Sequence, residues 1–130
     1  MTKRFGRNTW SIVVPDGWHA SHGDECSTLE NSTGALQLSA YFKSSEVSEA
    51  DLREFASEHL EAGAIPSAAR CGDFIGFEFA YADDECFCRQ WHLRHGTQLL
   101  FVTYTCALGH ERDHDAALDR ALGSLVATDP

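Results

Sequence analysis

Residues 73–106, DFIGFEFAYADDECFCRQWHLRHGTQLLFVTYTC, decide the fold because they hold three consecutive strand patterns separated by turns. Side chains alternate over 73–81, and Ala82-Asp83-Asp84 then turns the chain into 85–95. His95-Gly96 turns it again into 97–106, which is apolar on both faces and therefore typical of a strand inside a sheet. Turns this short predict an antiparallel sheet.

Further strands are expected on both sides of this stretch. Pro15-Asp16-Gly17 ends a first alternating segment, and Asn31–Gly34 reads as a hairpin turn. The pattern predicts strands over 8–14, 24–30, 35–43 and 65–70.

Two amphipathic helices are also expected. Ser48 is typical of an N-cap, and Asp51 completes a capping box with it. An apolar stripe then runs to Leu60, and Gly63 is placed to end the helix. A second helix is predicted over 110–125.

These elements predict an α+β fold: one domain over 1–130, with a twisted antiparallel sheet of about six or seven strands and helices packed on both faces. The expected core consists of Trp10, Ile12, Leu38, Phe55, Phe77, Phe79, Trp91, Phe101 and Leu122.

Composition restricts the class of partner. The chain has 130 residues and a formal net charge of −10. Such a surface repels phosphate backbones and anionic lipids, so we expect a basic or neutral protein partner, and neither nucleic acid nor membrane. The first ten residues have no apolar run behind their basic residues, so we expect a cytoplasmic location and reduced thiols at all five cysteines.

The order of elements resembles the PsbP and Mog-type proteins. The resemblance rests on a strand leading into Pro15-Asp16-Gly17-Trp18, the hairpin through Arg89 and Trp91, and a final helix ending in Gly123-Ser124-Leu125. It implies a twisted antiparallel sheet sandwiched by helices. It implies no function, because known members serve unrelated ones, from a photosystem subunit to Ran binding. In size and charge alone, the chain also resembles bacterial immunity proteins.

The segment His110-Glu111-Arg112-Asp113-His114 matches H-E-x-x-H. On a helix, His110 and His114 would share a face and could hold zinc, with Glu111 as the base. No further His or Glu follows to supply a third ligand, and the charged middle residues suit a solvated turn. A zinc-dependent hydrolase is therefore kept as the alternative function.

Two other groups are more simply explained by packing. Cys86, Cys88 and His92 share one face of the 85–95 strand. Cys86 and Cys88 lie at or past the limit for a disulfide, and Cys88 and His92 are too far apart to share a zinc directly, so a metal site would need a ligand from a neighbouring strand. Arg89 beside Trp91 is expected to pair with Glu78 or to lie over an aromatic ring.

The first predicted helix is strongly acidic on its outward side, where only Arg53 faces the carboxylates. We therefore expect a non-enzymatic protein-interaction domain without a cofactor, of which an immunity-type or secretion-associated protein is the most specific version. The predicted partner-binding residues are Glu49, Glu54, Glu58 and Glu61. Solubility alone also accounts for such a surface.

Overall fold

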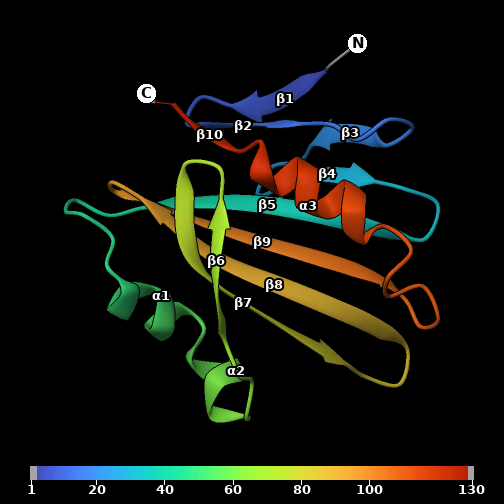
Figure 1. Cartoon of the computed structure of the whole chain (residues 1–130). Helices are drawn as coiled ribbons and strands as arrows, with labels where there is room; N and C mark the ends of the chain where they lie inside the picture. The colour runs from blue at the N-terminus through green and yellow to red at the C-terminus, as the bar shows by residue number, and fades with distance from the viewer. Residues whose placement is uncertain (1–2, 129–130) are drawn as a thin grey trace.

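The computed structural model describes residues 3–128, and its largest element is a seven-stranded antiparallel sheet (Figure 1). In spatial order its strands are β3 (His19–His22), β4 (Ser27–Glu30), β5 (Gly34–Phe42), β9 (Gln98–Ala107), β8 (Cys86–His95), β7 (Phe74–Ala82) and β6 (Ser67–Cys71). The expectation that 97–106 is an inner strand is confirmed, because β9 is the middle strand and the residues Leu99 to Val102 are buried or half-buried on both of its faces.

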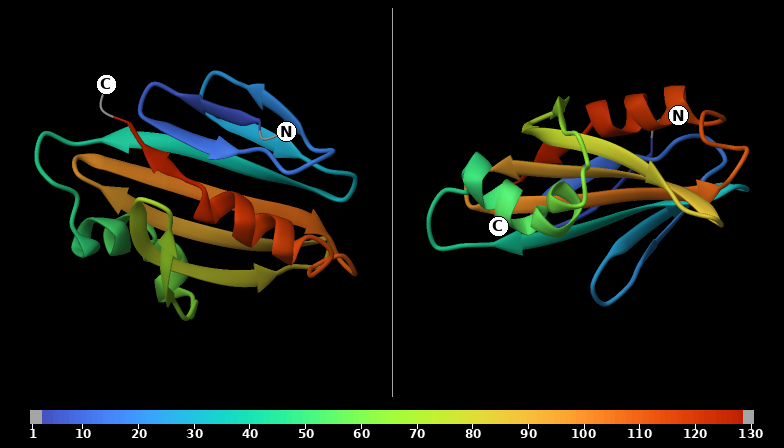
Figure 2. Two further views of the ribbon diagram at one scale, coloured as in Figure 1. Left: turned by 45° about the horizontal axis from the view of Figure 1, so that its top comes forward. Right: turned by 90° about the horizontal axis from the view of Figure 1, so that it is seen from below.

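One face of this sheet carries the main core. It is covered by α3 (Asp115–Gly123) and by a separate three-stranded sheet of β1 (Arg4–Arg7), β2 (Trp10–Val13) and β10 (Val126–Ala127). In Figure 2, α3 lies across the large sheet and β10 continues from it toward β2. Trp10 and Ile12 of β2 and Leu118 and Leu122 of α3 are buried in this core.

The opposite face has a smaller core beneath two short helices, α1 (Glu49–Phe55) and α2 (Ser57–Glu61). Its members are Val47, Leu52, Ala56, Phe77, Phe79 and Leu99. The expected capping box is confirmed: the Ser48 hydroxyl accepts a hydrogen bond from the Asp51 backbone, and the Ser48 backbone donates to the Asp51 carboxylate at 2.8 Å.

The expected fold class, α+β with helices packed on both faces, is wrong. Strands take up 48% of the described residues and helices 17%, so the protein is mostly β. The three helices within residues 3–128 contain seven, five and nine residues, too few to form helical layers. A second sheet takes the place of a helical layer. Side-chain alternation shows that a strand has a buried face, but it does not show which sheet the strand joins.

Several element boundaries also differ from the expectation. The helix expected to run to Leu60 is interrupted at Ala56, whose φ of −93° and ψ of 7° are not helical. The helix expected from 110 begins at Asp115. Gly63 does follow the end of α2, with a φ of 106°. The strand patterns did not predict β1, β3 and β10.

Seven of the nine predicted core residues are buried and Phe101 is half-buried, but Phe55 is 42% exposed. Its place in the predicted core was wrong because α1 packs over β7, β8 and β9 through Leu52 and Ala56, which leaves Phe55 at the border of the contact. No helix in the described part of the chain is both long and apolar enough to span a bilayer.

Candidate functional site

The predicted partner-binding glutamates are all exposed, but they belong to two different helices and do not share one face. Glu49 lies beside Arg53 on one flank of α1, with 3.4 Å between carboxylate and guanidinium. Glu54 faces away from the sheet, because two helical positions rotate it about 200° from the buried Leu52. Glu58 and Glu61 belong to α2. We call residues 49–61 the acidic segment.

Asp51 does not contribute to a free acidic surface. Its carboxylate accepts hydrogen bonds from Lys43, at 2.8 Å, and from the Ser48 backbone. The Lys43 hydrogen bond, followed by the one from Ser48, lowers the pKa of Asp51 from 3.8 to about 2. Of the glutamates in the predicted set, Glu54, Glu58 and Glu61 form no ion pair with any described residue.

Three aromatic side chains, one of them within the acidic segment, lie in contact with one another. Tyr41, on β5, is 47% exposed, and its ring centroid lies 5.2 Å from that of Phe55. The Phe55 ring is in turn 5.4 Å from that of Phe101 on β9. We call Tyr41, Phe55 and Phe101 the aromatic patch.

A histidine cluster lies beneath α1 and α2. The side chain of Gln90 is its centre: its amide lies 2.9 Å from the Tyr81 hydroxyl, 3.3 Å from His92 Nε2 and 3.4 Å from His59 Nε2. The sequence reading did not find this cluster. The one feature of the sequence that could have indicated it is the polar residue Gln90, which shares a strand face with His92.

His92 is only 1% exposed, and four phenylalanine rings surround it at centroid distances of 5.1 to 5.9 Å. Its Nδ1 atom is buried without a hydrogen-bond partner among the described residues. With Nε2 facing the Gln90 carbonyl oxygen, a second proton on Nδ1 would create a charge in an apolar surrounding. Burial, assisted by His59, therefore lowers the pKa of His92 to about 4. An enclosed, neutral imidazole of this kind cannot act on a substrate at the surface.

The regular alternation of β8 places Cys86, Cys88 and His92 on one face, as the sequence predicts. Within residues 3–128, however, no group of three or more His, Cys, Asp and Glu side chains is close enough to hold a metal ion. Cys88 is buried, and its thiol lies 3.8 Å from the Thr105 hydroxyl.

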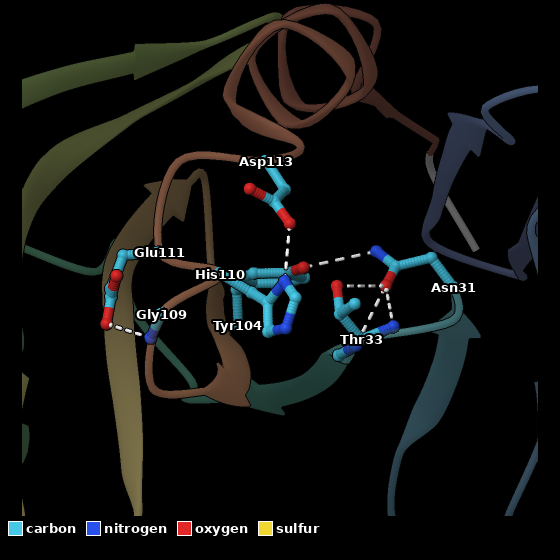
Figure 3. A network of polar contacts seen from close by, with 8 residues as sticks. Asn31, Thr33, Tyr104, Gly109, His110, Glu111 and Asp113 are labelled. Atoms are coloured by element: carbon cyan, nitrogen blue, oxygen red, sulfur yellow. Dashed lines mark hydrogen bonds and ion pairs between the residues drawn. The ribbon is translucent and has the colours of Figure 1, made fainter.

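The H-E-x-x-H segment is not helical, because residues 111–114 form turns that precede α3. Figure 3 shows the His110 ring directed at Asp113, with 2.6 Å between Nδ1 and the carboxylate, while Glu111 accepts from the Gly109 backbone. His114 packs edge-on against Trp18. The helical face on which the zinc-hydrolase alternative depends is therefore not formed.

Both interactions proposed for Arg89 are confirmed. Its guanidinium lies 2.8 Å from the Glu78 carboxylate and 4.6 Å from the centre of the Trp91 ring. A second carboxylate, that of Asp115, lies 3.5 Å away at the start of α3. Arg89 thus links β8 to β7 and to α3, which is a structural role.

The comparisons with known proteins reveal a shared fold and no family. No protein-family model and no curated protein matches the chain. A crystal structure from Bacteroides thetaiotaomicron matches with a TM-score of 0.68 and 16% identity over 92% of this chain and 45% of that one, so this chain spans about half of its length. LpqN, involved in cell envelope biogenesis of Mycobacterium tuberculosis, matches with a TM-score of 0.65 and 14% identity. That match covers 99% of this chain and 91% of LpqN. Neither is named as a PsbP or Mog-type protein, so the chain is similar to both in fold alone and that resemblance stays a prediction.

Proposed function

We propose that this chain is a non-enzymatic protein-interaction domain, which binds a partner rich in basic and apolar side chains. The binding surface consists of the aromatic patch and of the carboxylates of Glu54, Glu58 and Glu61. The observation that carries the proposal is the contact between two half-exposed rings, Tyr41 and Phe55, next to Glu54, whose carboxylate forms no ion pair among the described residues.

The two parts of this surface would contribute differently to binding. Aromatic side chains are enriched among the residues that carry most of the energy of protein interfaces, because each buries a large rigid area. Carboxylates at the rim mainly accelerate the encounter with a basic partner, and salt screens this effect. Glu49 belongs to the other flank of α1 and is already paired with Arg53, so we expect little from it.

The experiment compares two sets of variants for binding to a partner recovered by crosslinking to the wild-type protein. Tyr41→Ser should mainly increase the dissociation rate. Combined Glu54→Gln, Glu58→Gln and Glu61→Gln should mainly slow association at low salt and have less effect at high salt. The matched control changes three exposed carboxylates elsewhere, with Asp24→Asn, Glu25→Gln and Glu30→Gln.

The control set removes the same charge from the end of the sheet that holds β3 and β4. Binding that the control set weakens as much as the acidic-segment set would mean that only net charge matters. Binding that is unaffected by both Tyr41→Ser and the acidic-segment set would overturn the proposal.

A further inference from the structure

The strand at the β6 edge of the large sheet is open along its outer side. Within residues 3–128, β6 pairs only with β7, and Gly72 and Asp73 form the two-residue turn between them, with Cys71 opposite Phe74. In an antiparallel pair joined this way, hydrogen-bonded and non-hydrogen-bonded positions alternate from the turn. The backbone N–H and C=O groups of Ala68 and Arg70 therefore point away from β7.

This edge has few of the features that usually block strand addition, although Arg70 is charged and Pro66 directly precedes the strand. Its side chains over 67–69 are Ser, Ala and Ala, and no lysine or proline lies within the strand. Among the described residues, no backbone hydrogen bond from a loop or turn reaches Ala68 or Arg70. The edge thus offers two donors and two acceptors to an incoming chain.

A row of three side chains on one face of the sheet lies beside this edge. Arg70 of β6 is opposite Ile75 of β7, and Ile75 is opposite Arg94 of β8. With strands about 4.8 Å apart, the two arginine backbones lie roughly 10 Å from each other, so both guanidinium groups can reach a ligand above Ile75. Ile75 is 40% exposed, which provides an apolar floor between the two positive charges.

These arginines differ from the others near α1 and β8. Arg53 and Arg89 have carboxylate partners, whereas neither Arg70 nor Arg94 forms an ion pair with any described residue. Arg94 makes a 3.4 Å contact with the Val47 carbonyl. Two unmatched cations side by side are unexpected in a chain with twenty acidic and ten basic residues.

A shallow cavity of about 380 Å³ connects the row to the edge strand. Its lining includes Ala68, Arg70, Ile75 and Arg94. Glu49 also lines it, and the Glu49 carboxylate lies 3.4 Å from Arg53 Nε. Carboxylate groups suit this cavity because arginine binds them in a two-pronged geometry.

We infer that β6 accepts an extended peptide as an eighth strand, and that this peptide places an acidic side chain on Arg70 and Arg94 above Ile75. Backbone hydrogen bonds to Ala68 and Arg70 supply affinity, and the arginine pair selects a carboxylate at one position, as in other cases of strand addition. A second copy of this chain is a poorer occupant, since its net charge of −10 repels it and its own β6 would bring further arginines. The inference concerns the flank of α1 opposite the aromatic patch and does not depend on the proposed function.

The test uses a capped hexapeptide in which valine alternates with glutamate, and a matched peptide with lysine in place of glutamate. Binding to the full chain is followed by NMR shifts and by hydrogen exchange of backbone amides. The glutamate peptide should slow exchange at Ala68 and Arg70, and the lysine peptide should not. Combined Arg70→Gln and Arg94→Gln should weaken binding about tenfold or more. Combined Arg112→Gln and Arg120→Gln, at exposed positions just before and within α3, is the matched control and should leave binding unchanged.

A second variant tests the addition of the strand while leaving the arginine pair intact. Ala68→Pro removes one outward N–H without breaking the β6–β7 ladder, so the fold should persist while peptide binding is lost. Equal binding of both peptides, or no protection of the two amides at millimolar peptide, would overturn the inference. So would full reproduction of the shifts by acetate alone, which would indicate an anion site without an added strand. Protection of β6 that depends on protein concentration without peptide would identify a second copy as the occupant and overturn it as well.

Discussion

His92 is the residue whose chemistry depends most on its surroundings. An exposed histidine in the unfolded chain titrates near its usual pKa of 6.5, but in the folded protein burial lowers the pKa of His92 to about 4. Between these values the unfolded chain binds a proton that the folded protein does not. The contribution of the neutral, buried His92 ring to the free energy of unfolding is therefore complete above pH 6.5 and declines as the pH falls from 6.5 toward 4.

Replacing the ring should remove this dependence. For the His92→Leu variant we expect a flatter plot of unfolding free energy against pH over this range, whatever its absolute stability. Urea denaturation at a series of pH values measures it, with His19→Leu, at an exposed position, as the control. Parallel curves for wild type and His92→Leu would contradict the lowered pKa.

Alternation along the strands correctly predicted which side chains are buried, such as Phe79 and Trp91. The helical spacing in α1 led to a wrong prediction for Phe55, because an apolar stripe shows which side of a helix is apolar but not how far the sheet extends beneath it. Alternation also missed the link between Gln90 and His92. Periodicity reports burial, whereas hydrogen-bond partners are set by contacts between distant segments.

At the scale of elements, the start of α1 depends on one cap. The helix has only seven residues, so the reciprocal bonds between Ser48 and Asp51 are a large share of what holds its first turn. Ser48→Ala should lower the free energy of unfolding by about 1 kcal/mol. Ser45→Ala, an exposed change in the preceding loop, should have almost no effect. If urea denaturation finds equal losses for the two variants, the cap does not stabilise α1.

The start of α1 was predictable because a capping box depends only on residues close together in the sequence, but the end of the helix was not predictable. Position 56 is an alanine and not one of the usual helix-ending residues, glycine or proline. The helix ends there because Leu52 and Ala56 pack onto the sheet. The expected helix over 110–114 failed for a local reason. There the Glu111 carboxylate accepts a hydrogen bond from the Gly109 backbone N–H, and this local bond favours a turn over a continued helix.

For the molecule as a whole, the distribution of cysteines predicts graded reactivity. Cys71, Cys88 and Cys106 are buried, and burial raises the pKa of Cys71 to about 11. Cys26 and Cys86 are half-buried, and the pKa of Cys86 is raised by burial and by Asp83. We expect a thiol reagent at pH 8 to modify Cys26 first in the native protein.

Unfolding in the absence of reductant should then expose all five cysteines as thiols. Mass spectrometry of the labelled protein distinguishes the two stages. A count of three or one after unfolding would contradict the expectation of reduced cysteines. Prior labelling of Cys71 would contradict the packing of the main core.

The overall architecture was predictable only in part. In the large sheet, β5 pairs with the distant β9 and β3 was not predicted. The β4–β5 hairpin and the strands from β6 to β9 follow from turns and alternation, which are encoded in contiguous residues. The three-stranded sheet does not, because β10 joins β2 through pairs such as Val126 with Ser11. Contacts between the two ends of a sequence leave no local pattern, and this is why a layer of strands was mistaken for a layer of helices.

This pairing of distant segments has a consequence for synthesis on the ribosome. Trp10 and Ile12 share their core with Leu118 and Leu122 of α3. At typical elongation rates these partners are made about 5–20 s later. Until then, β2 presents an indole and an isoleucine side chain to the surrounding solvent or to a chaperone. The nascent chain can form its hairpins as they emerge, but the main core closes only after α3 has left the exit tunnel.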